Sequence, residues 1–139
     1  MHKNLFKEVA QCREAIHVVV IGTKPDIIKQ VPLIQKLRSR GHFTLVIHSG
    51  QHSAYNLSGG LEEEFNLEVD VNINCHGSLY EQQSQIILKL GSLFKEIKSL
   101  NKQIIPYVSA DTTTALAAAI ASFTNLISVV HVEAGLRTM

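Results

Sequence analysis

Residues 16–21 read Ile-His-Val-Val-Val-Ile, and this run constrains the fold more than any other feature of the sequence. Nearly every residue in it is apolar and β-branched, which is typical of a strand buried on both faces of a sheet. Apolar residues then recur at helical spacing over 24–40, and short apolar runs keep alternating with helical periods along the chain. We therefore predict an α/β fold with a mostly parallel sheet and helices on both faces.

The same two periods predict the other elements. Further strands are expected at 43–48, 69–73, 104–109 and 127–132, and further helices at 79–100 and 112–124. Residues 1–15 have the apolar spacing of an additional amphipathic helix. Two pairs with capping-box spacing, Thr23 with Asp26 and Ser78 with Glu81, mark the starts of two helices.

Length, charge and cysteine usage exclude several classes of protein. The 139 residues amount to one domain of ordinary size, or to one piece of a larger protein. The formal net charge is +1 without a basic stripe, which argues against nucleic-acid binding. No apolar run is long enough to span a bilayer, so we expect no membrane association. Cys12 and Cys75 have no partner spacing, and we interpret them as reduced thiols of a cytoplasmic protein.

Polar and charged residues follow four of the predicted strands, at the points where these strands end. Ligands of open parallel sheets bind beyond the carboxyl ends of the strands, so these residues are expected along one edge. They are Gly22, Thr23, Lys24 and Lys29, then Ser49, Gln51 and His52, then Asp111 and Thr112, and finally Glu133 and Arg137. Lysines and helix N-termini suit phosphate, and carboxylates move protons. Position alone thus predicts an anionic, polar ligand such as a nucleotide sugar, but no particular reaction.

Each candidate also has a purely structural interpretation. These are a helix cap for Thr23, solvated surface charge for Lys24 and Lys29, and a partner of the helix dipole for Asp111. Glu133 could pair with Arg137. His131 and Glu133, together with His48 or His52, raise the question of a metal site, but their spacing is not that of a strong metal motif, so we expect no metal.

Four segments at these strand ends resemble a known protein family. They are GTKPDIIKQVPLI (22–34), HSGQH (48–52), SADTTTALAAAIA (109–121) and HVEAGLRT (131–138). Together they are similar to the N-terminal domain of the non-hydrolysing UDP-N-acetylglucosamine 2-epimerases, over residues 16–139 and excluding the 1–15 extension. The resemblance implies one Rossmann-like half of a glycosyltransferase-B arrangement. It also implies interconversion of UDP-N-acetylglucosamine and UDP-N-acetylmannosamine by elimination and re-addition of UDP, without a cofactor or a metal.

The resemblance further implies roles for individual residues. Asp111 and Glu133 correspond to catalytic carboxylates, and Thr23, Lys24, Lys29 and Arg137 correspond to substrate-binding positions. Gln51 and His52 match a segment that in bacterial members helps to bind a second, regulatory UDP-sugar. Three positions depart from the family pattern. Lys24 stands in place of an arginine and loses its bidentate fork, Asp26 stands in place of a glutamate, and Ala110 stands in place of a glycine.

The family implies a second domain of similar size that supplies the other wall of the substrate cleft, whereas this chain stops at Met139. We therefore expect little or no epimerase activity from the 139-residue chain alone, and a homodimer for the parent protein. The alternative is a non-catalytic UDP-sugar-binding or assembly module derived from the same family. A third hypothesis is a metal-dependent hydrolase that uses Asp111, His131 and Glu133.

Overall fold

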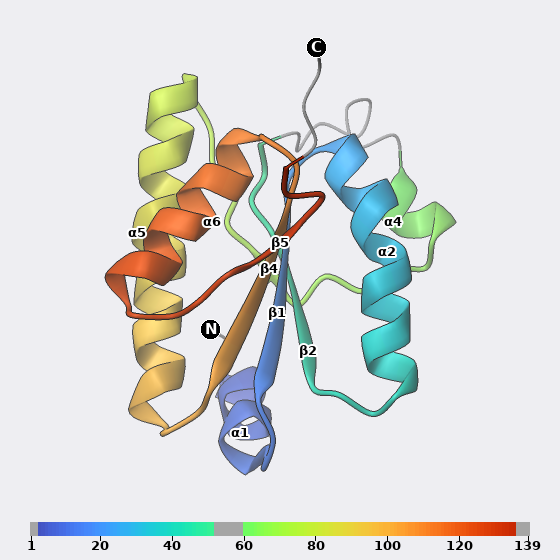
Figure 1. The fold of residues 1–139 in the computed structure, drawn as a ribbon, viewed down its shortest axis with the longest axis vertical. Helices are drawn as coiled ribbons and strands as arrows, with labels where there is room; N and C mark the ends of the chain where they lie inside the picture. Colours follow the sequence, from blue (N-terminus) through green and yellow to red (C-terminus); the bar gives the residue numbers. More distant parts are fainter. Residues whose placement is uncertain (1–2, 52–59, 136–139) are drawn as a thin grey trace.

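The computed structural model of the protein describes residues 3–51 and 60–135. Within these ranges the chain forms one five-stranded sheet in the order β3-β2-β1-β4-β5, and every neighbouring pair is parallel (Figure 1). The strands are β1 (Ile16–Ile21), β2 (Thr44–His48), β3 (Val71–Asn72), β4 (Ile104–Ser109) and β5 (Val130–Val132). The predicted α/β fold with a parallel sheet is confirmed.

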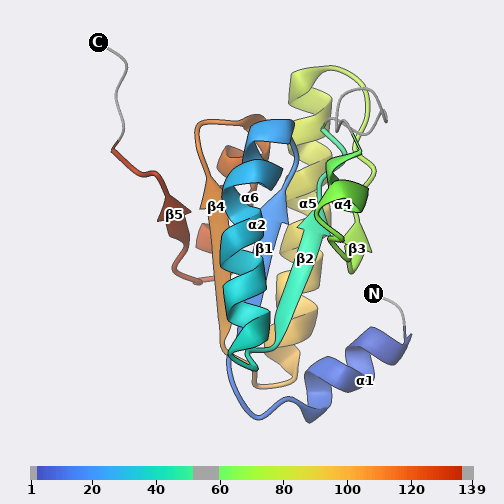
Figure 2. The same ribbon diagram turned by 90° about the vertical axis from the view of Figure 1, so that its right-hand side faces the viewer.

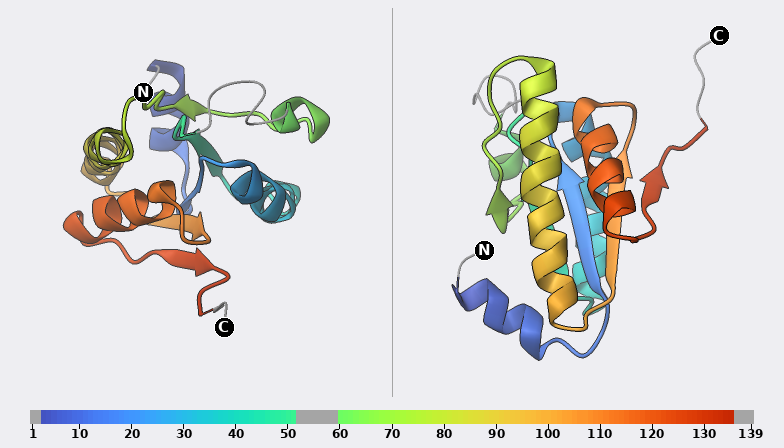
Figure 3. Two further views of the ribbon diagram at one scale, coloured as in Figure 1. Left: turned by 90° about the horizontal axis from the view of Figure 1, so that it is seen from above. Right: turned by 90° about the vertical axis from the view of Figure 1, so that its left-hand side faces the viewer.

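Helices cover both faces of this sheet. They are α1 (Lys3–Gln11), α2 (Lys24–Ser39), α4 (Leu61–Glu64), α5 (Leu79–Ser99) and α6 (Thr113–Thr124). Figures 1 and 3 show α2 and α4 on one face and α5 and α6 on the other, with α1 beside the amino end of β1. The two directions of strand addition explain this split. Right-handed crossovers put helices on opposite faces when the chain moves toward β3 and when it moves toward β5.

The continuous apolar run of β1 is explained by this two-sided cover. Val18 and Val20 belong to the core layer under α5 and α6, together with Leu90 and Phe94 of α5. Val19 and Ile21 belong to the layer under α2 and α4, where the apolar residues of α2 pack. Because successive side chains of a strand point to opposite faces, a strand between two helical layers has no solvent-facing side. Helix α1 joins the first layer through Val9, which is fully buried.

The predicted boundaries are correct within one residue for the central strands and the long helices, but not at the two edges of the sheet. Strands were expected at 69–73 and 127–132, whereas β3 has two residues and β5 has three. Figure 2 shows these two strands at opposite edges. Each has a pairing partner on one side only, so fewer ladder hydrogen bonds extend it. The four-residue helix α4 was not predicted, because four residues are too few for a helical period to be recognised.

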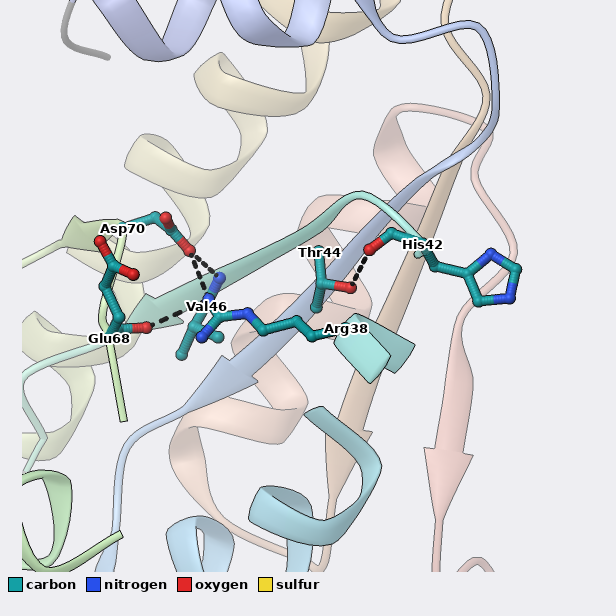
Figure 4. Close-up of polar contacts among 6 residues, drawn as sticks. All are labelled: Arg38, His42, Thr44, Val46, Glu68 and Asp70. Atoms are coloured by element: carbon teal, nitrogen blue, oxygen red, sulfur yellow. Dashed lines mark hydrogen bonds and ion pairs between the residues drawn. The ribbon is translucent and has the colours of Figure 1, made fainter. Parts of the chain in front are cut away.

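Asp70 fixes the start of edge strand β3 against β2. Val46 N donates to Asp70 Oδ2 at 2.7 Å, and Asp70 N donates to Val46 O at 2.9 Å. Arg38 Nη2 donates to the same carboxylate and to Glu68 O, both at 3.3 Å (Figure 4). Burial is the largest influence on the Asp70 carboxyl and raises its pKa, although Val46 N–H and Arg38 act in the opposite direction. This cluster lies at the β3 edge of the sheet, away from the four strand-end loops that the sequence singled out.

Two sequence expectations concern membranes and cysteines. Among residues 3–51 and 60–135, no helix combines the length and the apolar character needed to cross a bilayer. Both cysteines are free thiols, and Cys75 is buried next to the end of β2, where its backbone N donates to Ser49 O at 2.9 Å. Burial raises the pKa of the Cys75 thiol, which keeps it protonated at neutral pH.

Candidate active site

Four of the predicted site residues follow the carboxyl ends of four different strands. Thr23 follows β1, Gln51 follows β2, Asp111 follows β4 and Glu133 follows β5. Because all neighbouring strands are parallel, these four ends lie at the same edge of the sheet, the upper edge in Figure 1. The structure therefore gathers residues from distant parts of the sequence along one rim, where open α/β sheets bind ligands.

Thr23 and Asp26 form a complete capping box at the start of α2. Asp26 N donates to Thr23 Oγ at 3.4 Å, and Thr23 N donates to Asp26 Oδ2 at 3.1 Å. Both side chains are buried, and burial is the largest influence on the Asp26 carboxyl, raising its pKa. Lys24, the first residue of α2, is exposed. The capping function of Thr23 is thus established, and its side chain is already engaged by the protein.

Lys29 and Glu133 form an ion pair across the rim. The Lys29 Nζ lies 2.5 Å from Glu133 Oε2, and the two side chains are 37% and 32% exposed. The hydrogen bond to Glu133 is the largest influence on Lys29 and raises the pKa of its ammonium. The charges of Asp26 and Asp111 act in the same direction. One cation therefore lies within electrostatic reach of three carboxylates, and it pairs with Glu133.

Two residues at the rim have an unusual backbone. Ala110 has φ +60° and Glu133 has φ +64°, both in the left-handed region that favours glycine. His131 Nε2 lies 2.7 Å from Ala110 O, which ties the end of β5 to the turn after β4. Ala110 adopts a conformation that glycine adopts at lower cost.

A compact polar cluster lies between the β2 and β4 ends of the rim. It consists of Ser49, Gln51 and Thr114, joined by hydrogen bonds of 2.7 to 3.1 Å. Ser49 was noted in the sequence only for its position, and Thr114 was missed. Three consecutive threonines at the start of a helix were the only available signal, and they do not indicate which hydroxyl points inward. The structure shows that Thr114 is 1% exposed.

A recess of about 370 Å³ opens beside Asp111, on the α6 side of the sheet. Its wall is mostly apolar and comes from three elements: Val108 of β4, Ala115 and Leu116 of α6, and Val129 beside β5. Asp111 itself is exposed at its mouth. A carboxylate at the mouth of an apolar recess can meet a polar group of a ligand whose apolar part fills the recess.

The other predicted residues have different outcomes. His52 and Arg137 lie outside the described residues. The predicted Glu133–Arg137 pair therefore includes one residue that the structure does not describe. In the part of the chain that the structure describes, no group of three or more His, Cys, Asp or Glu side chains is arranged to hold a metal ion. His131, which the metal hypothesis invoked, instead contacts the Ala110 carbonyl oxygen.

The sequence has relatives among proteins of known activity. The profile of one family, described as UDP-N-acetylglucosamine 2-epimerase, matches residues 35–139. UDP-N-acetylglucosamine 2-epimerases of Methanococcus maripaludis and Methanocaldococcus jannaschii are 36% and 33% identical to this chain over 123 and 126 residues. Each comparison covers 86% of this chain and 32% of the relative. The chain therefore spans about one third of the length of these relatives.

Solved epimerase structures share the fold. The crystal structure of the Methanocaldococcus jannaschii UDP-GlcNAc 2-epimerase in complex with UDP-GlcNAc and UDP gives a TM-score of 0.80 at 32% identity, over 88% of this chain and 33% of that chain. The Neisseria meningitidis enzyme bound to UDP-GlcNAc gives 0.77 at 31% identity, over the same shares. The predicted resemblance is confirmed, and the chain belongs to the UDP-N-acetylglucosamine 2-epimerase family.

Proposed function

We propose that this chain is part of the N-terminal domain of a UDP-N-acetylglucosamine 2-epimerase, whose complete form interconverts UDP-N-acetylglucosamine and UDP-N-acetylmannosamine. Family membership supports the substrate class, since related structures contain UDP-GlcNAc and UDP. The observation that carries the proposal for this chain is the Lys29–Glu133 pair within reach of the Asp111 charge. A cytoplasmic location and a homodimeric parent protein belong to the same proposal.

The reaction requires a proton to leave and return at C2 of the sugar. In the first half, the C2–H and C1–O bonds break, UDP departs and a C1–C2 double bond forms, which gives 2-acetamidoglucal. In the second half, the proton and UDP add back, with the opposite configuration at C2. Two carboxylates suffice to remove and return the proton, and we assign these roles to Asp111 and Glu133.

Cations are needed where the diphosphate binds. We assign substrate contacts to Thr23, Lys24, Lys29 and Arg137, which the family resemblance indicated. Lys29 is the best supported of these, because Glu133 already holds its ammonium at the rim. Lys24 carries the charge but has no bidentate geometry for phosphate. A regulatory contact through Gln51 and His52 stays a prediction.

A second candidate function is a non-catalytic UDP-sugar-binding or assembly module. One observation favours it: Ala110 carries a strained conformation next to Asp111. Catalysis in a cleft depends on excluding water and closing around the sugar. We therefore propose that the 139-residue chain alone turns over little or no UDP-GlcNAc.

The test joins residues 1–139 to the remaining two thirds of the Methanocaldococcus jannaschii relative and assays the interconversion. We expect turnover that falls by roughly 100-fold or more in Asp111→Asn and Glu133→Gln. Glu96→Gln, an exposed carboxylate on α5, is the matched control and should be fully active. Equal activity of all variants would refute the assigned roles. Binding of UDP-GlcNAc without turnover in the unsubstituted fusion would favour the binding module.

A further inference from the structure

Thr114 lies at the meeting point of three strand-end loops. It is the second residue of α6, three positions after Asp111, and its side chain is buried. Its Oγ donates to Gln51 Oε1 at 2.7 Å, and its backbone N donates to the same oxygen at 3.1 Å. Gln51 therefore satisfies a backbone N–H at the start of α6 that has no partner within the helix.

The directions of the hydrogen bonds in this cluster follow from the chemistry of the groups. The Gln51 amide oxygen can only accept, so the Thr114 hydroxyl must be the donor in the hydrogen bond between them. The contact of 2.8 Å between Ser49 Oγ and Thr114 Oγ then requires Ser49 to donate. Ser49 Oγ in turn accepts from Gln51 N at 3.1 Å. The bonds form a closed ring in which each hydroxyl donates once and accepts once.

The end of β1 presses against the same two hydroxyls. A Cβ added to Gly22 would overlap Thr114 Oγ and Ser49 Oγ, and it would lie 2.9 Å from Thr114 Cβ. The loop after β1, the loop after β2 and the first turn of α6 thus converge on Thr114. Substrate contacts and the Asp111 carboxylate are assigned to these same loops.

We propose that Thr114 is a positioning residue that holds Asp111 in register with the loops after β1 and β2. The hydroxyl ring transmits a displacement of Gln51 to the start of α6, and the short connection from Thr114 carries it to Asp111. The positioning itself is a property of the fold. Only its consequence for UDP binding rests on the proposed function.

The hydroxyl carries this role, rather than the volume of the side chain. Valine has nearly the shape of threonine, but it would leave the buried Ser49 hydroxyl without its acceptor and Gln51 without one donor. Serine keeps the hydroxyl and removes one methyl group. Thr114→Ser should therefore restore what Thr114→Val loses. Ser122→Ala is the matched control, because Ser122 is a buried hydroxyl of the same helix, and its Oγ donates to the backbone oxygen of Ala118 at 2.8 Å.

Backbone amide spectra of the 139-residue chain test the positioning. Gln51→Met should shift the Asp111 amide resonance, although the two residues are far apart in sequence, and Thr114→Val should shift the amides of Gly22, Gln51 and Asp111. Thr114→Ser should restore the wild-type positions, and Ser122→Ala should leave them in place. An Asp111 amide that does not respond to Gln51→Met overturns the proposal, even if Thr114→Val fails to fold. A serine variant that resembles the valine variant also overturns it.

UDP titration of the same variants, carried in the fusion with the remaining two thirds of the Methanocaldococcus jannaschii relative, separates this proposal from the proposed function. We expect Thr114→Val and Gln51→Met to raise the Kd for UDP roughly tenfold, with Thr114→Ser and Ser122→Ala close to wild type. An unsubstituted fusion that binds neither UDP nor UDP-GlcNAc counts against the proposed function. In that case the amide shifts still decide whether Thr114 positions Asp111.

Discussion

The Lys29 ammonium lies 2.5 Å from the Glu133 carboxylate, so the second turn of α2 is tied to the end of edge strand β5. Both side chains remain about one third exposed, and ion pairs of this kind contribute little to folding stability. The pair instead orients one cation and one carboxylate at the rim where Asp111 also lies. Among the groups that raise the pKa of Lys29, Glu133 has the largest effect.

The order of these effects on the pKa of Lys29 gives the first prediction. Glu133→Gln should lower the pKa of Lys29, because the hydrogen bond to Glu133 is the largest influence that raises it. Asp111→Asn should lower the same pKa by less, since Asp111 acts only through its distant charge. An NMR pH titration of the Lys29 side-chain signals measures both effects. The expected order is contradicted if Asp111→Asn produces the larger change.

The second prediction concerns Gly22. Gly22→Ala should lower the free energy of unfolding by about 2 kcal/mol or more, because the new methyl group meets the Thr114 and Ser49 hydroxyls in a packed interior. Gly91→Ala is the control. Gly91 lies inside α5, where a Cβ would lie 3.8 Å from Asn125 Nδ2. That substitution should stabilise the chain by about 0.5 to 1 kcal/mol through helix propensity. Urea unfolding of both variants decides the matter, and similar effects at the two glycines would contradict the close approach.

The third prediction tests the backbone at position 110. Ala110→Gly should raise the free energy of unfolding by about 0.5 to 1 kcal/mol, because glycine adopts φ +60° without the steric cost that alanine bears. Ala119→Gly, in the middle of α6, should cost about 1 kcal/mol instead. We therefore expect the two Ala→Gly substitutions to change the free energy of unfolding in opposite directions, as measured by thermal or urea unfolding. A destabilised Ala110→Gly variant would contradict the left-handed conformation.

Local patterns in the sequence predict much of this fold. The apolar run at 16–21, the helical period after it and the two capping boxes each depend on residues close together in the chain. The rim itself also follows from sequence, because the ends of parallel strands meet at one edge once the strand order alternates with helices. The sequence therefore predicts that Asp111 and Glu133 lie at the same edge of the sheet.

Contacts between distant side chains could not be predicted in this way. The pairing of Lys29 with Glu133 depends on the rotation of α2 and on the turn after β5, where Glu133 has a positive φ. The role of Thr114 depends on which of three adjacent threonines faces Gln51. Neither the rotation of α2 nor the direction of a threonine side chain is encoded by a periodic pattern or a residue spacing in the sequence. The edge strands were overpredicted for a related reason, since their length depends on neighbours that β-propensity does not describe.

The two capping boxes provide the last prediction, because the same motif has opposite electrostatics at its two sites. Asp26 is 1% exposed, and burial raises its pKa above the ordinary value, whereas Glu81 is exposed and its hydrogen bonds to Ser78 lower its pKa. Because folding raises the pKa of Asp26, this residue stabilises the fold below its unfolded-state pKa, and the stabilisation is lost as pH rises through the native pKa. Because folding lowers the pKa of Glu81, this residue stabilises the fold above its unfolded-state pKa, and the stabilisation is lost as pH falls through the native pKa.

Asp26→Asn and Glu81→Gln should therefore change the pH dependence of unfolding in opposite senses. As pH rises from roughly pH 4, the difference in free energy of unfolding between the wild type and Asp26→Asn should become smaller, because the ionised Asp26 is disfavoured in its buried position. As pH rises toward roughly pH 4 from below, the free energy of unfolding of the wild type should increasingly exceed that of Glu81→Gln. The reason is that the ionised Glu81 accepts from Ser78 N at 2.7 Å and from Ser78 Oγ at 2.6 Å. Urea unfolding of the three proteins between roughly pH 3 and pH 7 measures both differences. If the two differences move in the same direction with pH, burial does not control Asp26, and its capping box is equivalent to the exposed one.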